Sequence, residues 1–421
     1  MSDEFLWFVG IDWATERHQT CLIDREGGTR KQYEVEHTAA GVRAFVEWLR
    51  ERVGGDLVRV AVAIETPRGA LVDTLLELGL AVFAINPKQL DRFRDRHTAA
   101  GAKDDRRDAL VLGDSLRTDR VAFRRVQVED PLVIQLRDLS RAEDDLQEDF
   151  IRVTNRLREQ VYRIAPPLLT LCPAADEPWF WTLLEQVVTR RASGLTRRQV
   201  ERVLRDHRIR RLTAEDVLTQ LRAPALSTAP GVMDAVQSHL SLLLPQVRVI
   251  SDQRKRCGTR VEALLTALET QENSEGQSGE HRDVTILRSL PGVGRKVAAT
   301  MLAEASRLLA DRDYHTPRRY GGSAPVTKSS GKSRARPFVH MRYACNHRVR
   351  QALYHWSRVS LVADDASHAY YRRLRARGHS HGRALRSVAD RLLRVLIAML
   401  KNRTLYDPAR GSSCRPVETP A

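Results

Sequence analysis

The sequence predicts an α/β domain at the N-terminus and a mainly helical remainder. Two observations carry this prediction. Short apolar or β-favouring runs alternate with helical spacing over the first 85 residues, and from Leu132 onward apolar residues recur every three or four positions. With 421 residues, the chain also exceeds the usual size of one hydrophobic core, so two or three domains are expected.

The predicted N-terminal domain, residues 1–128, begins with three short strands at 5–11, 19–24 and 31–36, which fit a meander. Helices are expected at 39–52 and 71–78, a buried central strand at 57–65 and a further strand at 80–85. This order predicts a mixed sheet covered by helices.

A helical region is expected at 129–275. Stepping alternately by four and three meets mostly apolar residues over 132–164 and again over 236–268, which is typical of coiled-coil seams. Ordinary helices packed in a bundle explain the spacing equally well. Pro245 suggests that the second helix starts or kinks there. Between the two series, 166–229 is expected to form an inserted helical subdomain, to which no chemistry can be assigned.

Positive charge is concentrated in the last third of the chain. The net charge is +16, and residues 281–421 hold 28 basic and 9 acidic side chains. We expect a basic domain at 281–405 that binds a polyanion, with a flexible tail at 406–421. No signal peptide or membrane segment is expected, so the predicted location is cytoplasmic, and nucleoid-associated in a bacterium. A solvated basic surface remains the alternative.

Four acids form the candidate catalytic set. Asp12 and Glu65 end apolar strands, and Asp105 and Asp108 lie one helical turn apart. Converging carboxylates repel one another unless cations hold them, and such a set can bind two Mg²⁺ or Mn²⁺ ions for phosphoryl transfer. Taken singly, each acid has another explanation: Asp12 as a turn or cap residue, Glu65 as a salt-bridge partner, and Asp105 and Asp108 as solvated helix charges near Arg106 and Arg107.

Two segments of the basic domain suggest phosphate contacts. Residues 287–303 place a Pro-Gly-Val-Gly turn between helical patterns, so that Gly292, Gly294, Arg295 and Lys296 could hold a backbone phosphate, as in a helix-hairpin-helix. Residues 320–336 are rich in Gly, Ser and cations. There Ser330 has an electropositive setting but no local base, and the expected nucleic-acid contacts are Lys328, Lys332, Arg334, Arg336, Arg348 and Arg350.

The motifs together resemble the DEDD transposases of the IS110 and IS1111 type. They are Gly-Ile-Asp12, Ile-Glu65, Lys-x-Asp105-x-x-Asp108-Ala, Leu-Pro-Gly-Val-Gly and Gly-x-x-Pro-x-x-x-x-Ser330-Gly. Two departures are Asp104, where relatives commonly have Thr, and the inserted 166–229 region.

This resemblance implies a RuvC-like domain of the RNase H fold, a coiled coil that supports a dimer or tetramer, and a C-terminal transposase domain. Asp12, Glu65, Asp105 and Asp108 would bind metal, and Ser330 would be the nucleophile that forms a transient phosphoserine link to DNA. The acids of one protomer would meet the serine of another, and a bridge RNA would pair with donor and target DNA. The alternatives are a RuvC-like structure-selective nuclease that uses water and an inactive nucleic-acid-binding protein.

Overall fold

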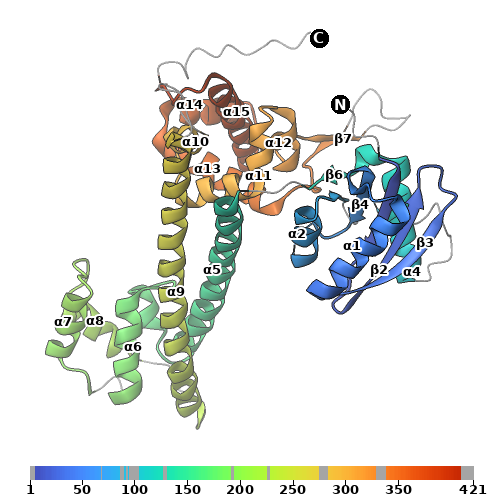
Figure 1. Ribbon diagram of the computed structural model, residues 1–421. Helices are drawn as coiled ribbons and strands as arrows, with labels where there is room; N and C mark the ends of the chain where they lie inside the picture. Colours follow the sequence, from blue (N-terminus) through green and yellow to red (C-terminus); the bar gives the residue numbers. More distant parts are fainter. Residues whose placement is uncertain are drawn as a thin grey trace. The chain divides into compact units, whose positions relative to one another are not determined.

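The computed structural model describes residues 5–67, 69–85, 90–91, 93, 104–126, 130–190, 194–224, 228–274, 283–328 and 338–408. The chain divides into two compact units, residues 1–130 and 131–421. Figure 1 shows the helices and strands of both units.

The first unit is built on a six-stranded sheet with the order β3-β2-β1-β4-β5-β6. β1 runs antiparallel to β2 and parallel to β4, while β4 runs parallel to β5. β2 also pairs antiparallel with β3, and β5 with β6. The strands are β1 (Trp7–Asp12), β2 (Arg17–Asp24), β3 (Arg30–Glu36), β4 (Val60–Ile64), β5 (Ala81–Ala84) and β6 (Arg124–Arg125).

Helices cover both faces of this sheet. α1 (Ala39–Val53) and α2 (Ala70–Glu77) pack on the face that carries Val9, Ile11, Val62 and Ile64. α4 (Asp105–Thr118) packs on the face that carries Phe8, Ala61, Ala63 and Phe83. Short 3-10 turns, η1 (Leu57–Arg59) and η2 (Arg120–Ala122), precede β4 and β6. Both faces of β4 are therefore buried, which explains its unbroken apolar sequence.

The predicted combination of a mixed α/β sheet with a mainly helical remainder is confirmed. The strand expected over 57–65 is split, because Asp56 caps the 3-10 turn η1 before β4 begins at Val60. β6 was not expected. It consists of two exposed arginines at a sheet edge, without the apolar signal of a strand.

Two long helices organise the second unit, α5 (Pro131–Ile164) and α9 (Val232–Ser274). They pack along each other within the chain (Figure 1). Leu136 shares a core with Leu264 and Leu268, whereas Leu157 shares another with Leu240 and Leu243, so the pair is antiparallel. The two apolar series thus meet each other inside one chain, and α9 continues through Pro245.

Smaller helices lie at the two ends of this pair (Figure 1). At one end are η3 (Pro166–Thr170), α6 (Pro178–Arg190), α7 (Arg197–Asp206) and α8 (Ala214–Leu221). At the other end are α10 (Asp283–Ser289), α11 (Arg295–Ala310), α12 (His315–Tyr320), α13 (His347–Ala363), α14 (Asp365–Ala376) and α15 (His381–Asn402), with a hairpin of β7 (Val326–Lys328) and β8 (Phe338–His340). No helix among the described residues is long and apolar enough to cross a membrane.

Candidate active site

Asp12 and Glu65 lie at the same edge of the sheet. β1 and β4 are parallel neighbours, and their register pairs Ile11 with Ile64. Asp12 is the last residue of β1 and Glu65 directly follows β4, so the two acids occupy equivalent positions at the carboxyl ends of adjacent strands. Both are half-buried.

The alternation of side chains along the strands puts both acids on one face. In β1, Phe8 contributes to the core under α4, whereas Val9 and Ile11 contribute to the core under α1 and α2. Asp12 lies four residues after Phe8, so alternation places it on the same face of the sheet as Phe8. In β4, Ala61 and Ala63 belong to the face that α4 covers, and Glu65, two residues after Ala63, continues this alternation. The backbone therefore assigns Asp12 and Glu65 to the face that α4 covers.

The backbones of α4 and β1 lie so close together that there is no room for a side chain at Gly10 or Gly113. A Cβ atom on Gly10 would lie 1.9 Å from the Ala109 carbonyl oxygen and 2.5 Å from the Gly113 amide nitrogen. A Cβ atom on Gly113 would in turn lie 2.9 Å from the Gly10 nitrogen. These two glycines bring the first half of α4 onto the end of β1. Asp108, next to Ala109, is thereby held near the strand that ends in Asp12.

The three aspartates at the start of α4 have different surroundings. Asp104 is the N-cap, and its side chain accepts a hydrogen bond of 3.1 Å from the Arg106 backbone N–H. Asp105 is exposed in the first turn. Asp108 is only 6% exposed, although burying a carboxylate is costly without compensating partners. Capping uses the side chain of Asp104, whereas Asp105 and Asp108 are the candidate metal ligands of this segment.

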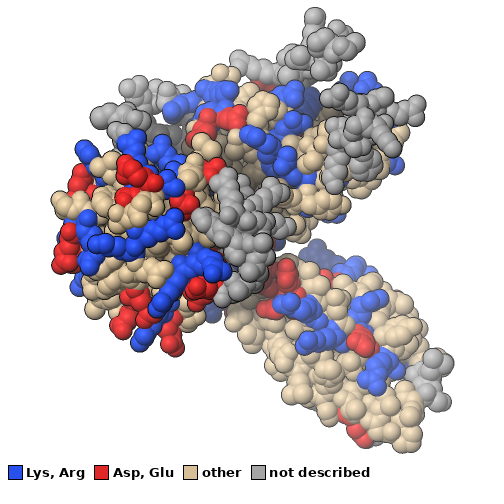
Figure 2. All heavy atoms as spheres, turned by 90° about the vertical axis from the view of Figure 1, so that its right-hand side faces the viewer, with Lys and Arg blue, Asp and Glu red and all other residues tan. Residues whose placement is uncertain are grey.

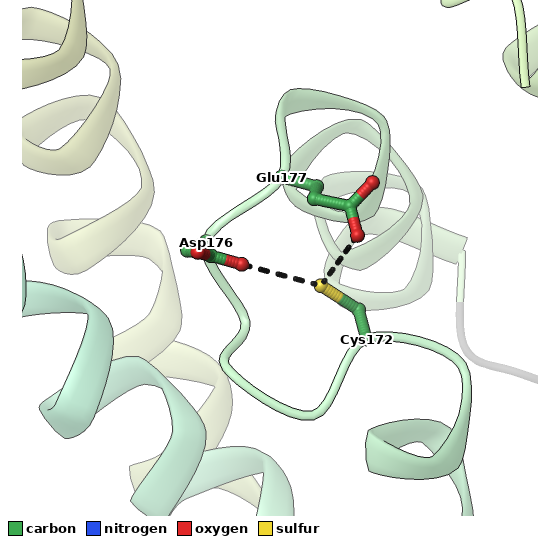
Figure 3. Close-up of side chains that lie close together, drawn as sticks. All are labelled: Cys172, Asp176 and Glu177. Atoms are coloured by element: carbon green, nitrogen blue, oxygen red, sulfur yellow. Dashed lines mark hydrogen bonds between the residues drawn. The ribbon is translucent and has the colours of Figure 1, made fainter. Parts of the chain in front are cut away.

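Only oxygen donors make up this acidic set, which suits a hard divalent cation. No three of these four described acids have ligand atoms within 4.8 Å of one another. Among the described residues, Cys172, Asp176 and Glu177 do form such a group (Figure 3). Closing the acids around an ion would therefore require side-chain adjustment.

The Cys172 group is better explained as a structural contact than as a metal centre. Both carboxylate oxygens of Glu177 already accept hydrogen bonds, 2.6 Å from Arg211 Nη2 and 2.9 Å from Trp179 Nε1. Burial raises the pKa of the Cys172 thiol, which disfavours the thiolate that a metal would require. The group ties the loop before α6 to the segment after α7.

The Pro-Gly-Val-Gly turn packs against α13. Gly292 has φ 81°, and a Cβ atom there would lie 2.7 Å from the Ser360 amide nitrogen. Pro291 supplies the carbonyl that accepts a hydrogen bond of 3.0 Å from Trp356 Nε1. Gly294 is exposed and N-caps α11. Close packing against α13 thus explains why position 292 is a glycine, whereas Gly294 is open to solvent.

Three cations predicted to bind phosphate form ion pairs with α5. Lys296 Nζ lies 2.7 Å from Asp144 Oδ1, Arg295 pairs with Glu143, and Arg348 pairs with Asp144. A phosphate at this turn would have to compete with these carboxylates. The ion pairs connect α5 to the C-terminal helices.

The remaining predicted contacts are Arg350 on α13, Lys328 at the end of β7 and residues between β7 and β8 in the sequence. Arg350 donates hydrogen bonds to the carbonyls of Arg342 and Tyr343 and so braces the segment before α13. Lys328 ends β7, and its side chain lies outside the described residues. Ser330, Lys332, Arg334 and Arg336 also lie outside the described residues.

A basic hollow of about 560 Å³ lies beside this hairpin, lined by Asp313, His315, Arg318, Arg319, Ala324, Pro325 and Arg342. Arg318 is paired with Asp390 at 2.6 Å. Hydrogen bonds from Thr316 and His315 lower the pKa of Asp313 to about 2, and its carboxylate accepts from the first two backbone N–H groups of α12. Arg319, Arg342 and His315 remain to attract an anion.

Arg386, on α15, is influenced by two further arginines, Arg383 and Arg350. Burial lowers its pKa first, and the charges of Arg383 and Arg350 lower it further. Sequence analysis did not single out Arg318, Arg319 or Arg386, because a helical arginine looks the same whether it faces solvent or a shared hollow. On the face drawn in Figure 2, basic and acidic side chains are interspersed, so the basic residues form no continuous patch on that face.

Two family models match the chain. A transposase model of the IS110 DEDD type covers residues 9–166, and a model of the IS116/IS110/IS902 transposase family covers residues 284–372. The first includes all four acids, and the second includes the glycine turn, the hairpin and the position of Ser330.

Curated relatives agree with these models. A candidate transposase of Sinorhizobium fredii is 43% identical over 218 residues, 51% of this chain and 60% of the relative. The mini-circle candidate transposase for IS117 of Streptomyces coelicolor is 31% identical over 421 aligned positions, 97% of each chain. A protein of insertion element IS110 from the same species is 28% identical over 95% of each chain. The chain therefore belongs to the IS110 family of DEDD transposases, enzymes of DNA transposition.

Proposed function

We propose that this protein cleaves and exchanges the DNA strands of an insertion sequence, with Asp12, Glu65, Asp105 and Asp108 as metal ligands and Ser330 as nucleophile. The observation that carries the proposal is the common edge of β1 and β4, where strand parity assigns Asp12 and Glu65 to the face covered by α4. The sheet order, with a meander followed by parallel β4 and β5, also supports a RuvC-like domain of the RNase H fold.

The acidic set fits a divalent cation because its donors are carboxylate oxygens on two adjacent strands and one helix. Mg²⁺ or Mn²⁺, two ions per site, would supply Lewis-acid stabilisation of charge on the phosphate. The chain's part is to fix the ligands. The sheet positions Asp12 and Glu65, and the close approach of α4 at Gly10 positions Asp108.

Ser330 is proposed to attack the scissile phosphorus. Its Oγ would lose its proton and form a bond to phosphorus, while the bond from phosphorus to the leaving strand oxygen breaks and that oxygen takes up a proton. A hydroxyl of the incoming strand would then reverse this exchange and release the serine. Arg319 and Arg342 in the hollow beside the hairpin are suited to hold the DNA backbone during these steps.

We further propose that the chain acts as a dimer or tetramer with composite sites, in which the acids of one protomer serve the serine of another. A bridge RNA would pair with donor and target DNA, so that base pairing would provide the sequence specificity. Donor and target DNA and this RNA are the proposed partners, and the nucleoid is the proposed location in a bacterial cell.

A recombination assay with matched variants tests the proposal. Purified protein, with any copurified RNA sequenced, is incubated with donor and target DNA in the presence and absence of Mg²⁺. Asp12→Asn and Ser330→Ala should each lower recombination by at least about 10³-fold, a loss typical of removing an essential catalytic group. Ser330→Cys tests whether another nucleophile of similar size retains activity.

Each alternative predicts a different result. A nuclease that uses water would keep cleaving DNA with Ser330→Ala and would form no covalent protein–DNA product. An inactive nucleic-acid-binding protein would bind DNA equally well with and without Asp12→Asn and cleave it in neither case. Recombination without any RNA would overturn the guided part of the proposal alone.

A further inference from the structure

The helical insertion contains a basic surface that the acids and the serine do not explain. α7 is fixed in place by its apolar face, where Val200, Val203 and Leu204 are buried in the core shared with α6 and α8. A capping box between Thr196 and Gln199 fixes its first turn. The orientation of the opposite face is therefore determined by packing.

That opposite face carries arginines on successive turns. Arg198, Arg202 and Arg205 are spaced by four and three residues, so they form one stripe along the helix, and all three are exposed. Arg197 lies beside them, and Arg208, Arg210 and Arg211 follow the helix end. Residues 197–211 contain seven arginines and two acids.

Neighbouring helices do not share this imbalance. α5 carries six basic and seven acidic residues, and α9 carries five of each. The solubility of the helical unit thus does not require a local excess of positive charge. Among the helices at this end of the α5–α9 pair, the excess lies on α7 and the segment after it, whereas α8 carries two acids and no basic residue.

The acids on α7 compensate the stripe poorly. Glu201 lies 2.8 Å from Arg197 Nε, but Asp206 is shared by Arg202 at 3.7 Å and Arg205 at 3.8 Å. The side chains of Arg202 and Arg205 are 76% and 77% exposed, so these pairs add little stability. Like charges three and four residues apart destabilise a helix by about 0.2–0.5 kcal/mol per pair. A polyanion bound along the stripe would remove this repulsion.

We propose that the arginine stripe of α7, Arg198, Arg202 and Arg205, binds the phosphate backbone of duplex DNA. DNA is favoured as the polyanion because it is the substrate of a transposase. Arginines spaced along one helix face can each contact a backbone phosphate, and such phosphate contacts carry no sequence information directly. The surface extends the proposed function but depends neither on Ser330 nor on the acidic set.

DNA binding by the full-length protein tests this surface. The affinity for a fluorescent duplex is measured over a series of salt concentrations, for wild type and for the triple variant Arg198→Gln, Arg202→Gln and Arg205→Gln. Each lost phosphate contact lowers the slope of log affinity against log salt by about 0.9, so the slope should shrink by about 2 to 3. The corresponding triple lysine variant, which keeps the charge, should retain most of the slope.

A matched control removes three arginines elsewhere. Arg43 and Arg50 on α1 and Arg59 in η1 are exposed, and α1 covers the sheet face away from the acids. Their replacement by Gln should leave the slope within about 0.5 of wild type, and Ser330→Ala should bind with the wild-type slope although it does not recombine.

Two results would overturn the proposal. One is a triple glutamine variant that keeps both the wild-type circular dichroism spectrum and the wild-type slope of log DNA affinity against log salt. The other is weakened binding of a structured RNA with unchanged binding of DNA, which would make α7 an RNA-binding surface. If the glutamine variant fails to fold, the single charge reversal Arg202→Glu replaces it, and that reversal should lower DNA affinity at least tenfold near 0.1 M salt.

Discussion

At the scale of single residues, Gly10 determines how α4 meets the sheet. Gly10→Ala would put a methyl group 1.9 Å from the Ala109 carbonyl oxygen, so α4 must move away from β1. We expect a loss of unfolding free energy on the order of 2 kcal/mol, together with reduced recombination because Asp108 moves with the helix. Thermal unfolding and the recombination assay measure the two effects.

Gly28→Ala is the matched control for this substitution. The nearest atom to its Cβ would be Asp24 Oδ2 at 3.8 Å, an ordinary contact. Its stability and activity should equal those of wild type. If Gly10→Ala also behaves like wild type, the close approach of α4 does not position the site.

His18 is a buried residue whose protonation should affect stability. It is fully buried in β2, and its Nδ1 accepts a hydrogen bond of 3.1 Å from the Ala14 N–H, in the turn after Asp12. Nδ1 is then unprotonated, so Nε2 donates to His37 Nδ1 at 2.9 Å. Burial lowers the pKa of His18, and the nearby His37 lowers it further.

Because the folded-state pKa lies below the ordinary value of 6.5, the unfolded chain takes up the proton first. This contribution to stability is complete above pH 6.5 and is lost as the pH falls below it. Chemical denaturation at pH 7.5 and pH 5.5 should show the decrease. His18→Gln should be less stable at pH 7.5 but less sensitive to pH, whereas His239→Gln, at an exposed position on α9, should keep the wild-type pH dependence.

At the scale of elements, α5 is joined to α11 by a largely buried ion pair. Arg141 Nε lies 2.8 Å from Glu304 Oε1, and the Glu304 side chain is 6% exposed. Burial alone would raise the pKa of Glu304, but the hydrogen bonds and charge of Arg141, with Asn346, hold it below its usual range. Removing one partner would therefore leave the other charge uncompensated between α5 and α11.

Glu304→Ala should therefore cost about 3 kcal/mol of unfolding free energy, because it leaves Arg141 without its partner at a half-buried position. Asp149→Ala is the control, since the Asp149 side chain is 48% exposed and pairs with Arg152 on the same helix. Its cost should stay below about 1 kcal/mol in the same urea titration. Equal costs would show that the Arg141 pair does not join the two helices.

Periodicity in the sequence revealed these elements but not their partners. The apolar series in α5 and α9 is visible from spacing alone, yet spacing does not tell whether a seam meets a second chain or another part of its own chain. Glu143 interrupted the α5 series as a polar residue, and its partner Arg295 lies 152 residues away. Such pairs are a property of the tertiary structure, so Arg295 and Lys296 looked like free phosphate ligands.

The sheet edge that holds Asp12 and Glu65 was easier to predict from the sequence than the hollow beside the β7–β8 hairpin. Asp12 and Glu65 follow apolar strands, and strand parity is fixed once the sheet order is known. The hollow beside the β7–β8 hairpin draws on α12, the segment before β7 and Arg342, and no spacing rule connects these segments.

At the scale of the whole molecule, the proposed composite site makes a testable prediction. If the acids of one protomer serve the serine of another, Asp12→Ala and Ser330→Ala proteins should each be inactive alone but active when mixed. In a mixed dimer, one composite site would carry both substitutions and the other would carry neither. At equal amounts and random pairing, half of the dimers are mixed and each of them has one intact site of two. About a quarter of all sites are then intact, so recombination should reach about a quarter of wild type when each site acts independently.

A site built from a single protomer gives the opposite result. Every site in the mixed dimer would then carry one substitution, and mixing would restore nothing. A mixture of Asp12→Ala with Glu65→Ala is the internal control, because both acids lie at one edge of the same sheet and cannot complement each other. The subunits must exchange before the assay, which mass measurement of differently tagged proteins can verify. Restored activity in the Asp12 and Ser330 mixture alone would therefore identify oligomerisation as a requirement of the chemistry.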